Sequence, residues 1–577
     1  MNAVPAVANS RLLLVADLRL DNREELLGRL GGTSVPTSDT ELLLAAWLKA
    51  GEECLSWIVG DFAIATYDSR VRVLTLARDP TGQIPLHYAG DGKDFAFATM
   101  PSGLRPFLGK LMVDRLALAG TLCSLTDAHS RSHFQQIARV LPGEVVRLGP
   151  EGLRRTIYWN PHTIYDEPLR GINFVDEYRH VLNVAVADRI KSSVRPIATH
   201  LSSGFDSSAV TATAARLAVS PEEVMAFTSA PSAATPIAPD LRRIADESQI
   251  AAATARELGV RHIIVRNMPP MREVVKRQSL LFQQAVISVP NVAWLLQIRR
   301  EAASAGANCL LSGYTGNITL NAGGLYILAE WIRQGRFLTW ARQAQRAAAR
   351  PDTHWRGVLF NSFWLWMPKR LSDMLERQYL GGGAFNFVPF LRPEWRSKAL
   401  ASAQPTPRFR NGYEERVHRI RGDDLGMFRK GGLAGEGIDE LDPLSDRRLI
   451  EFSLKIPPQE LYWDGVSRPL ARAALSDRVP RAVIDLKVRG IQAADWAMRF
   501  TQADAYQMLE EISVSATAQD LLNLNTMKQA IDCWPTANWN DRWVRYTYRE
   551  SLIGALSTGM FALVHEQGGA SATTASV

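Results

Sequence analysis

Hydrophobic and polar positions follow a strand-like pattern in the first part of the chain. Short runs rich in β-branched and aromatic residues lie between Asp and Gly turns, which is typical of strands. We predict strands at 11–20, 58–67, 71–77 and 94–99. Helical periodicity is clear only at 39–50, where Asp39 and Thr40 precede Glu41 and three leucines as a helix start. This part is therefore predicted to be β-rich.

After a linker-like stretch at 160–171, strand and helix patterns alternate. We predict strands at 197–201, 224–229, 262–266 and 308–311, and helices at 175–194, 207–217, 247–258 and 291–305. Such alternation is typical of a doubly wound parallel sheet, which binds ligands at the carboxyl ends of its strands. Residues 325–430 and those beyond 435 are mainly helical in pattern.

The length of the chain predicts more than one domain. A single hydrophobic core rarely serves 577 residues, and 46% apolar with 22% charged residues is ordinary for a soluble globular protein. We predict an α/β protein with a first domain over 1–165, a second over 171–565 with helical insertions, and a tail over 566–577. The end of the chain is rich in small residues, and we expect it to be disordered.

Cysteine spacing and hydropathy indicate a cytoplasmic protein. Cys54, Cys123, Cys309 and Cys533 lie far apart, without the CxxC spacing of a metal or redox site, so reduced thiols fit best. The apolar run at 12–16 is bracketed by charged residues and is too short for a signal sequence. Since no run of about 18 apolar residues occurs, we predict no membrane span.

Net charge changes this picture little. An excess of +7 over 577 residues, with a pI near 9.2, is weak evidence for an acidic partner. The segment 331–370 concentrates that charge, with eight Lys or Arg and one acid, Asp352. It could form a lid that grips a peptide through aromatic and Arg contacts, although such a stripe is more often helical core with arginines that reach out to water.

A loop that follows a predicted strand and turns at once into a helix carries the candidate chemistry. Its backbone N–H groups, its hydroxyls and the positive end of the helix dipole suit a phosphate group. The alternative is a plain strand-to-helix turn with a capping aspartate. No lysine follows the glycine as in a Walker loop, so γ-phosphate transfer is not expected. The residues are Leu201, Ser202, Ser203, Gly204, Phe205, Asp206, Ser207 and Ser208.

A second Gly-rich loop follows a later strand of the same predicted sheet. It runs through Leu311, Ser312, Gly313, Tyr314, Thr315, Gly316 and Asn317. With both loops in place, the chain resembles the asparagine synthetase family. The segments 21–26, 38–41, 60–63, 77–82 and 95–98 are similar to that family's amino-terminal glutaminase domain, and 437–446 and 486–488 to its carboxyl-terminal landmarks.

The resemblance implies a fold and an enzyme class. The fold would be a degenerate β-rich sandwich of the Ntn-hydrolase type, followed by a doubly wound ATP-pyrophosphatase (PP-loop) synthetase domain. The class would be an ATP-dependent, AMP-forming carbon–nitrogen ligase with ATP and Mg²⁺ as cofactors. The first loop and Gly313 and Gly316 of the second would bind the nucleotide.

The glutaminase pattern is broken at its chemical positions. The family has a cysteine directly after the initiator methionine, where this chain has Asn2. The matching oxyanion-hole Asn-Gly pair reads Asp17 and Leu18, and a carboxylate there would oppose a developing oxyanion. We therefore expect no glutamine hydrolysis, and an amino-terminal domain that is structural or serves docking.

Without glutamine-derived ammonia, the attacking amine should arrive with the substrate. That situation resembles the β-lactam synthetases and, more closely, the lasso-peptide cyclases. The resemblance then implies adenylation of an Asp or Glu side chain in a precursor peptide and attack by the peptide's α-amine, which gives an isopeptide macrolactam. A leader peptidase and a leader-recognition protein would be partners, and no nucleic acid is implied. The alternatives are an ammonia-dependent asparagine synthetase, a β-lactam-forming relative, or a catalytically dead scaffold.

The same resemblance assigns roles to single residues. Asp206 would bind Mg²⁺, and Asn317 stands where the synthetases have a second metal-binding aspartate, so a second ion would be absent or held differently. Tyr314 and Asp439 match a tyrosine and glutamate that deprotonate the amine, although Glu440 could replace Asp439. Lys487 matches a lysine that stabilises charge at the adenylate. Each could instead be a local structural contact or a surface residue.

Two further acids, Asp246 and Glu247, open a predicted crossover helix. Carboxylates in the first turn complement the helix dipole. We expect that structural role for both and no part in the site.

Overall fold

The computed structural model describes most of the chain. The described ranges are 11–31, 38–90, 94–125, 130–165, 169–191, 193–232, 243–350, 353–368, 371, 374–375, 389–403, 409–422, 424–486 and 488–568. Asn2, Lys487 and the predicted tail from 569 onwards lie outside these ranges. None of the described helices is long and apolar enough to cross a membrane.

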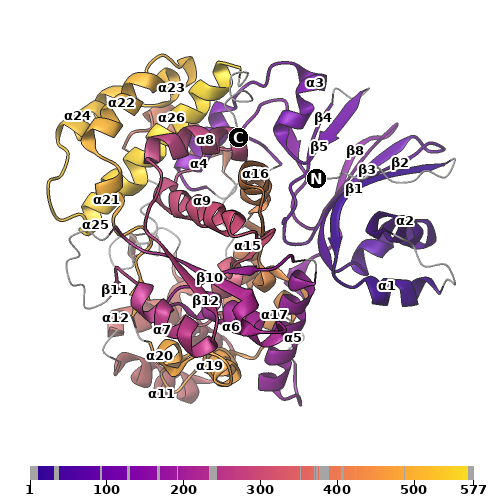
Figure 1. Ribbon diagram of the computed structural model, residues 1–577, viewed down its shortest axis with the longest axis vertical. Coiled ribbons are helices and arrows are strands. Elements are labelled where there is room, and N and C mark those ends of the chain that lie inside the picture. Colours follow the sequence, from indigo (N-terminus) through magenta and orange to yellow (C-terminus); the bar gives the residue numbers. More distant parts are fainter. Residues whose placement is uncertain are drawn as a thin grey trace.

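The amino-terminal domain consists of two antiparallel sheets. The larger has the order β1-β2-β3-β7-β8, formed by β1 (Leu12–Leu20), β2 (Gly60–Asp68), β3 (Val73–Arg78), β7 (Glu144–Gly149) and β8 (Gly152–Ile157). The smaller has the order β5-β4-β6, formed by β5 (Phe95–Ala98), β4 (His87–Gly90) and β6 (Ala138–Arg139). Ile84, Leu86 and Tyr88 form a buried cluster with side chains of the larger sheet, so the two sheets make a sandwich (Figure 1).

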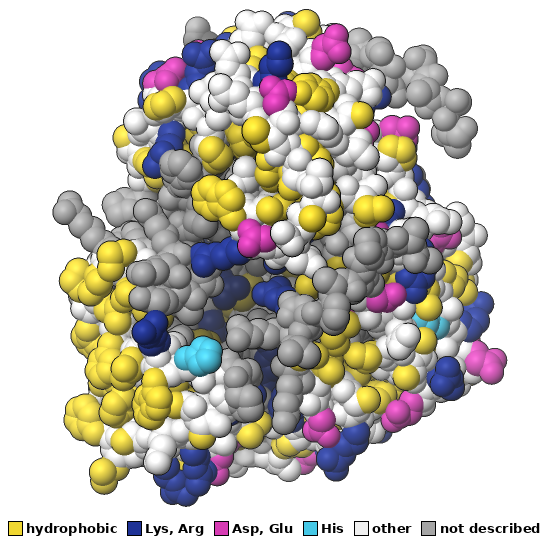
Figure 2. Space-filling view, turned by 90° about the vertical axis from the view of Figure 1, so that its left-hand side faces the viewer, with side chains coloured by type: hydrophobic (Ala, Val, Ile, Leu, Met, Phe, Trp, Pro, Cys, Tyr) yellow, Lys and Arg dark blue, Asp and Glu magenta, His cyan; other side chains and the backbone are white. Residues whose placement is uncertain are grey.

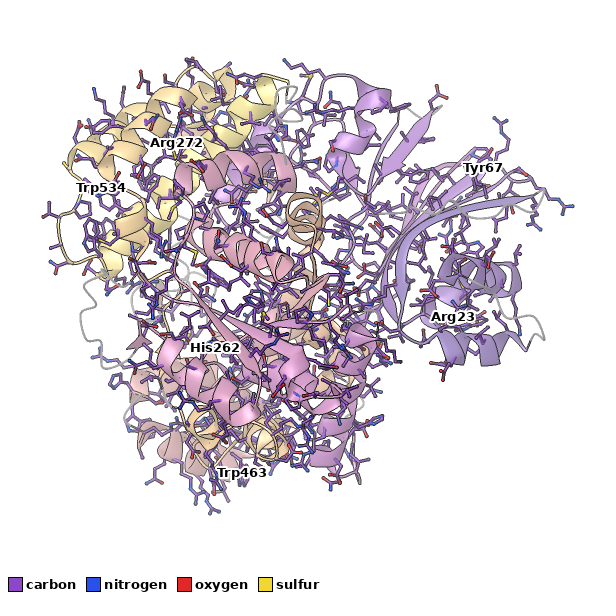
Figure 3. The ribbon with its side chains drawn as sticks, viewed as in Figure 1. Arg23, Tyr67, His262, Arg272, Trp463 and Trp534 are labelled. Atoms are coloured by element: carbon purple, nitrogen blue, oxygen red, sulfur yellow. The ribbon has the colours of Figure 1, made fainter. Side chains whose placement is uncertain are left out.

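Helices cover the other face of the larger sheet. The predicted helix 39–50 forms as α2 (Asp39–Ala50), which begins with a capping box between Ser38 and Glu41. Three short helices of the first part were not predicted, because helices of four to eight residues show too few turns to reveal a period. They are α1 (Arg23–Leu30), α3 (Arg105–Leu108) and α4 (Arg115–Leu122), of which α4 packs against α14 (Pro393–Ser402) and α26 (Ile553–Glu566). Figure 3 shows Arg23 and Tyr67 on this domain, apart from His262 of the second sheet.

The second domain is built on the predicted parallel sheet. Its order is β12-β10-β9-β13-β14, with every pair parallel. The strands are β9 (Ile197–His200), β10 (Val224–Ser229), β12 (Arg261–Val265), β13 (Cys309–Leu311) and β14 (Asp439–Leu441). The crossover helices are α5 (Phe174–Ile190), α6 (Phe205–Leu217), α7 (Ser248–Leu258) and α9 (Val289–Ser304). The strand order reverses direction between β9 and β13, which makes that crevice the expected ligand site of a doubly wound sheet.

Helices complete this domain above and below the sheet (Figure 1). In the middle of the chain they are α8 (Met271–Phe282), α10 (Ile327–Arg333), α11 (Phe337–Ala348), α12 (Trp355–Phe363), α14 (Pro393–Ser402), α15 (Gly412–Gly422) and α16 (Gly426–Glu436). Beyond β14 they are α17 (Arg447–Leu454), α18 (Pro458–Leu461), α19 (Pro469–Leu475), α20 (Arg481–Ile484), α21 (Trp496–Arg499), α22 (Gln502–Ile512), α23 (Ala516–Leu521), α24 (Leu524–Asp532), α25 (Arg542–Val544) and α26 (Ile553–Glu566). Short ladders pair β11 (Arg243–Ile244) with β17 (Arg489–Gly490), and β15 (Tyr462–Trp463) with β16 (Val466–Ser467).

The Trp- and Arg-rich segment is only partly helical core. Trp331 is fully buried, as the core interpretation predicts. Phe337, Leu338 and Trp355 are exposed at the surface of α11 and α12. The described part of this segment therefore buries one side of its helices and leaves aromatic residues on the other.

Buried ion pairs join the two domains through α16. Arg429 donates to Asp61 of β2 at 2.5 Å and to both carboxylate oxygens of Asp439 at 2.6 and 2.8 Å. The next residue, Lys430, lies 2.5 Å from the carboxylate of Asp17 in β1. Charged groups that are withdrawn from water must be paired, so these contacts fix the register between α16 and the amino-terminal sheet.

We predict that Arg429→Leu destabilises the chain by roughly 3 kcal/mol, since it leaves buried carboxylates without their partner. The effect should not exceed this because Arg19 still lies 3.0 Å from Asp61. The shift of the urea unfolding midpoint measures it. Arg11→Ala, which removes an exposed pair with Asp68, serves as the control and should leave the midpoint unchanged. Equal midpoints for the two variants would contradict a stabilising role for Arg429.

Candidate active site

The predicted phosphate-binding loop lies at the crevice between β9 and β13. It leaves β9 after His200 and enters α6 at Phe205. Ser207 Oγ accepts a hydrogen bond from the backbone N–H of Ser202 at 3.1 Å, and the two hydroxyls are 2.8 Å apart. Gly204 N–H donates to Ser202 Oγ at 3.0 Å. These bonds fold the loop over the start of α6, where the helix dipole favours an anion.

Asp206 lies directly against the second loop. A Cβ on Gly316 would lie 2.2 Å from Asp206 Oδ1, and one on Gly313 would lie 2.8 Å from the Asp206 carbonyl carbon, so only glycine fits at both positions. Asn321 Nδ2 donates to Asp206 Oδ1 at 2.6 Å, and Tyr178 Oη donates to Asn321 Oδ1 at 2.7 Å. The carboxylate of Asp206 is thus held in one orientation. Asn321 and Tyr178 were not identified from the sequence, because they lie far from both motifs along the chain.

Glu247 has a second role besides its place at the start of α7. Its Oε1 accepts from the backbone N–H of Ser203 at 3.1 Å and also from the Ser203 hydroxyl. Asp246 behaves as expected, since its carboxylate caps α7 by accepting from Ser248 N–H at 2.9 Å. The expectation for Glu247 was therefore incomplete: this residue also fixes the first loop.

The second proposed metal residue, Asn317, is already engaged. Its Oδ1 accepts from Arg468 Nη2 at 2.7 Å. A neutral amide whose oxygen is bound to a guanidinium is a poor ligand for a cation. In the described ranges no three His, Cys, Asp or Glu side chains form a group that could hold a metal ion. The donor set therefore fits one Mg²⁺, shared between Asp206 and phosphate oxygens, with Arg468 as a second positive charge.

Another arginine lies close to the first loop. The Arg472 guanidinium lies 5.3 Å from the ring centroid of Phe205, the first residue of α6. On the face of the molecule in Figure 2, Lys and Arg side chains gather in a recess at mid-height. A basic recess attracts anions such as nucleotide phosphates.

A large cavity opens beside the second loop. Its volume is about 1960 Å³, and residues of both domains line it, including Gln83 and His87 of the first and Tyr314 of the second. Tyr314 is 58% exposed. Ordinary small-molecule pockets measure about 300–1,000 Å³, so this space exceeds the need of a single amino acid.

Three carboxylates are candidates for the group that acts with Tyr314 to deprotonate the amine. Asp439 lies at the first position of β14, opposite Cys309, and is bound by Arg429, which lines the cavity whereas Asp439 does not. Glu440 lines the cavity and is bound by Arg299, whose charge holds the pKa of Glu440 well below its usual range.

Asp442, which lies within the matched segment 437–446, also lines the cavity. It follows the carboxyl end of β14 and accepts from both the backbone N–H and the hydroxyl of Thr315 at 2.8 Å. Burial raises the pKa of Asp442 to about 6. A search for polar residues at every predicted strand end would have found it, but the short strand 439–441 was not predicted.

Asp17, at the position of the missing oxyanion hole, is paired across the domain boundary. Lys430 of α16 occupies its carboxylate, as described above. A carboxylate with a lysine partner in this place offers no hydrogen-bond donors to an oxyanion. The geometry of the described residues is thus that of an interdomain contact.

A doubly wound sheet with a phosphate-type loop at its switch point defines an α/β enzyme that uses a nucleotide. A family model described as asparagine synthase matches residues 177–547, and one described as glutamine amidotransferase domain matches residues 9–159. The chain therefore belongs to the asparagine synthase family, a family of ATP-dependent carbon–nitrogen ligases.

Individual relatives match only part of the chain and at low sequence identity. Asparagine synthetase [glutamine-hydrolyzing] 3 of Bacillus subtilis (strain 168) is 32% identical over 205 residues, which cover 34% of this chain and 32% of the relative. Amidase chyE of Penicillium rubens is 30% identical over 241 residues, or 39% of this chain and 34% of the relative. The matched part therefore spans about a third of these curated relatives. A solved NH3-dependent NAD synthetase from Campylobacter jejuni has a TM-score of 0.20 at 13% identity, covering 38% of this chain and 98% of its own.

We predict that Gly316→Ala weakens ATP binding by about tenfold or more, equivalent to roughly 1.4 kcal/mol, because the new Cβ displaces the Asp206 carboxylate. Isothermal titration calorimetry with a non-hydrolysable ATP analogue measures the affinity. Gly357→Ala is the matched control, since a Cβ there meets nothing within 4 Å and should leave binding unchanged. Unaltered affinity in Gly316→Ala would place the nucleotide elsewhere.

Proposed function

We propose that this protein is an ATP-dependent lasso-peptide cyclase, which adenylates an Asp or Glu side chain of a precursor peptide and closes an isopeptide macrolactam with the peptide's amino-terminal amine. The cavity of about 1960 Å³ beside the second loop is the observation that carries the proposal, because it offers room for a peptide. The ion pair between Asp17 and Lys430 adds support, since it occupies the position that matches the oxyanion hole of the family's glutaminase domain.

In the first half-reaction the substrate carboxylate attacks the α-phosphorus of ATP, and pyrophosphate leaves. The first loop and the dipole of α6 would bind the phosphates, and Glu247 would keep Ser203 in place. One Mg²⁺ at Asp206 would neutralise charge on the phosphate oxygens. Arg468 would add positive charge opposite the departing pyrophosphate, next to Asn317.

In the second half-reaction the peptide amine attacks the acyl carbon, the carbon–oxygen bond to phosphate breaks, and AMP leaves. The ammonium group must first lose a proton. We assign its binding to the wall formed by Tyr314, Glu440 and Asp442. Asp442 is the carboxylate whose pKa is best matched to accept the proton near neutral pH, whereas Asp439 is committed to Arg429. Stabilisation of the acyl-adenylate by Lys487 stays a prediction.

The decisive experiment supplies ATP, Mg²⁺ and a leader-cleaved precursor peptide from the same gene neighbourhood. We expect AMP release that depends on the peptide and a product lighter by one water, measured by mass spectrometry. Asp206→Ala should abolish both, and the exposed Asp176→Ala should retain them. AMP release with aspartate and ammonia would instead identify an asparagine synthetase, and no turnover with any acceptor would identify a scaffold.

A second prediction concerns pH. Below about pH 6 Asp442 is protonated and cannot accept a proton, so the rate of amide formation should rise as the pH increases through that value. Asp442→Asn keeps an acceptor for Thr315 but has no basic group, and should be slow with no such rise. Single-turnover product formation between pH 5 and 8 tests this, with pyrophosphate release as the internal control. An inflection near 6 that persists in Asp442→Asn would assign the proton transfer to another group.

A further inference from the structure

A basic cluster lies on the wall of the same cavity, outside the nucleotide site. It consists of His162 in the turn η3 (Pro161–Thr163) and of His418 and Arg421 in α15, and all three residues line the cavity. Helix α15 packs against η3, which brings the three side chains into one region. We refer to this set as the basic cluster.

Among the residues that the structure describes, Arg421 takes part in no ion pair or hydrogen bond, and it lies in a half-buried position. Three described acids near the basic cluster are bound by other arginines. Glu144 accepts two hydrogen bonds from Arg155, at 2.7 and 2.6 Å, and Glu414 pairs with Arg410.

Asp424, also on the cavity wall, is bound by Arg78 at 2.7 and 2.8 Å. None of these three carboxylates is hydrogen-bonded to Arg421, although the charge of Glu144 acts on it from a distance. A half-buried arginine that faces a cavity without a bonded carboxylate keeps its guanidinium donors open to an anion.

The electrostatics of the basic cluster follow from this. Burial lowers the pKa of Arg421. Burial, and next the charge of Arg421, also lower the pKa values of His162 and His418. The positive charge of Arg421 therefore disfavours protonation of the two histidines. A bound anion would offset that charge and raise their pKa values.

The position of α15 places the basic cluster near the proposed reaction centre. Arg416, on the same helix, donates to the carbonyl oxygens of Ile318 and Thr319 at 3.3 and 3.1 Å, which fixes α15 to the second loop. Arg421 follows five residues later, about 7.5 Å along the helix axis and on another face of the helix. Because Tyr314 and the basic cluster line the same cavity, a peptide in it can touch both regions.

We propose that His162, His418 and Arg421 bind a second carboxylate of the substrate, separate from the one that is activated. The substrate class is then a peptide that carries a further acidic group, either a side chain or its carboxyl terminus. Arg is suited to this role because its planar guanidinium binds a carboxylate through two hydrogen bonds. The proposal rests on the proposed function only in that the substrate is a carboxylate-bearing peptide.

The test measures anion binding directly, without ATP or turnover. The full chain labelled at histidine Cε1 is titrated by NMR with glutarate, and with neutral glutaramide as the matched probe. Glutarate should shift the His162 and His418 resonances and raise both pKa values, and glutaramide should not. His162→Gln and His418→Gln assign the signals.

Arg421→Gln should remove the response, and Arg419→Gln, an exposed arginine on the same helix, should retain it. No shift with glutarate, or an equal shift in Arg421→Gln, overturns the proposal.

A kinetic arm separates this proposal from the proposed function. If the protein cyclises a peptide, Arg421→Gln should raise the KM for the acidic peptide by about tenfold and leave the KM for ATP unchanged, as loss of a charge-assisted hydrogen bond predicts. Arg421→Lys should restore part of the affinity. A glutarate response in a protein without cyclase activity would leave the anion site standing and refute cyclisation, whereas cyclisation with an unchanged KM would refute the anion site alone.

Discussion

The close approach of Asp206 to Gly316 is the constraint on which the site depends. The two loops leave adjacent parallel strands, so their tips meet at one edge of the sheet. The second loop reaches the carboxylate only because Gly313 and Gly316 carry no side chain. Asn321 and Tyr178 then orient Asp206 from below. The phosphate loop and the adjoining second loop are therefore placed against each other by the contact of Asp206 with the two glycines.

How far the sequence predicts this arrangement depends on how far apart along the chain the interacting residues lie. The strand and helix periods located the parallel sheet within a few residues, because burial on both faces leaves a strong pattern. Both loops followed from their strands. What could not be foreseen were contacts between distant segments: Asn317 with Arg468, Ser203 with Glu247, and Asp439 with Arg429. Asp439 lies within a matched motif, but Arg429 on α16 binds its carboxylate, and this contact cannot be read from the motif.

The domain boundary gives physical meaning to the loss of glutaminase residues. In an active glutaminase the position of Asp17 supplies hydrogen-bond donors, whereas here a carboxylate binds Lys430 across the boundary. Arg429 binds Asp61 in the same way. Of the two carboxylates Asp61 is the buried one, so loss of Arg429 would take a counter-charge from a group withdrawn from water. The ion pairs thus join the amino-terminal domain to the synthetase domain, and residues of both domains line the cavity.

The cavity is polarised, and this bears on how a substrate would lie in it. Asp442 and the Arg299-bound Glu440 lie beside Tyr314, while the basic cluster lies along α15. A peptide with an amine at one end and carboxylates elsewhere would bind in one orientation, with its amine towards Asp442 and a carboxylate towards the basic cluster. The amine would then lie next to the loop where an activated carboxylate would form. Under the proposed function, a peptide with a second acidic group would contact both regions of the cavity, whereas free ammonia has no second group to contact Arg421.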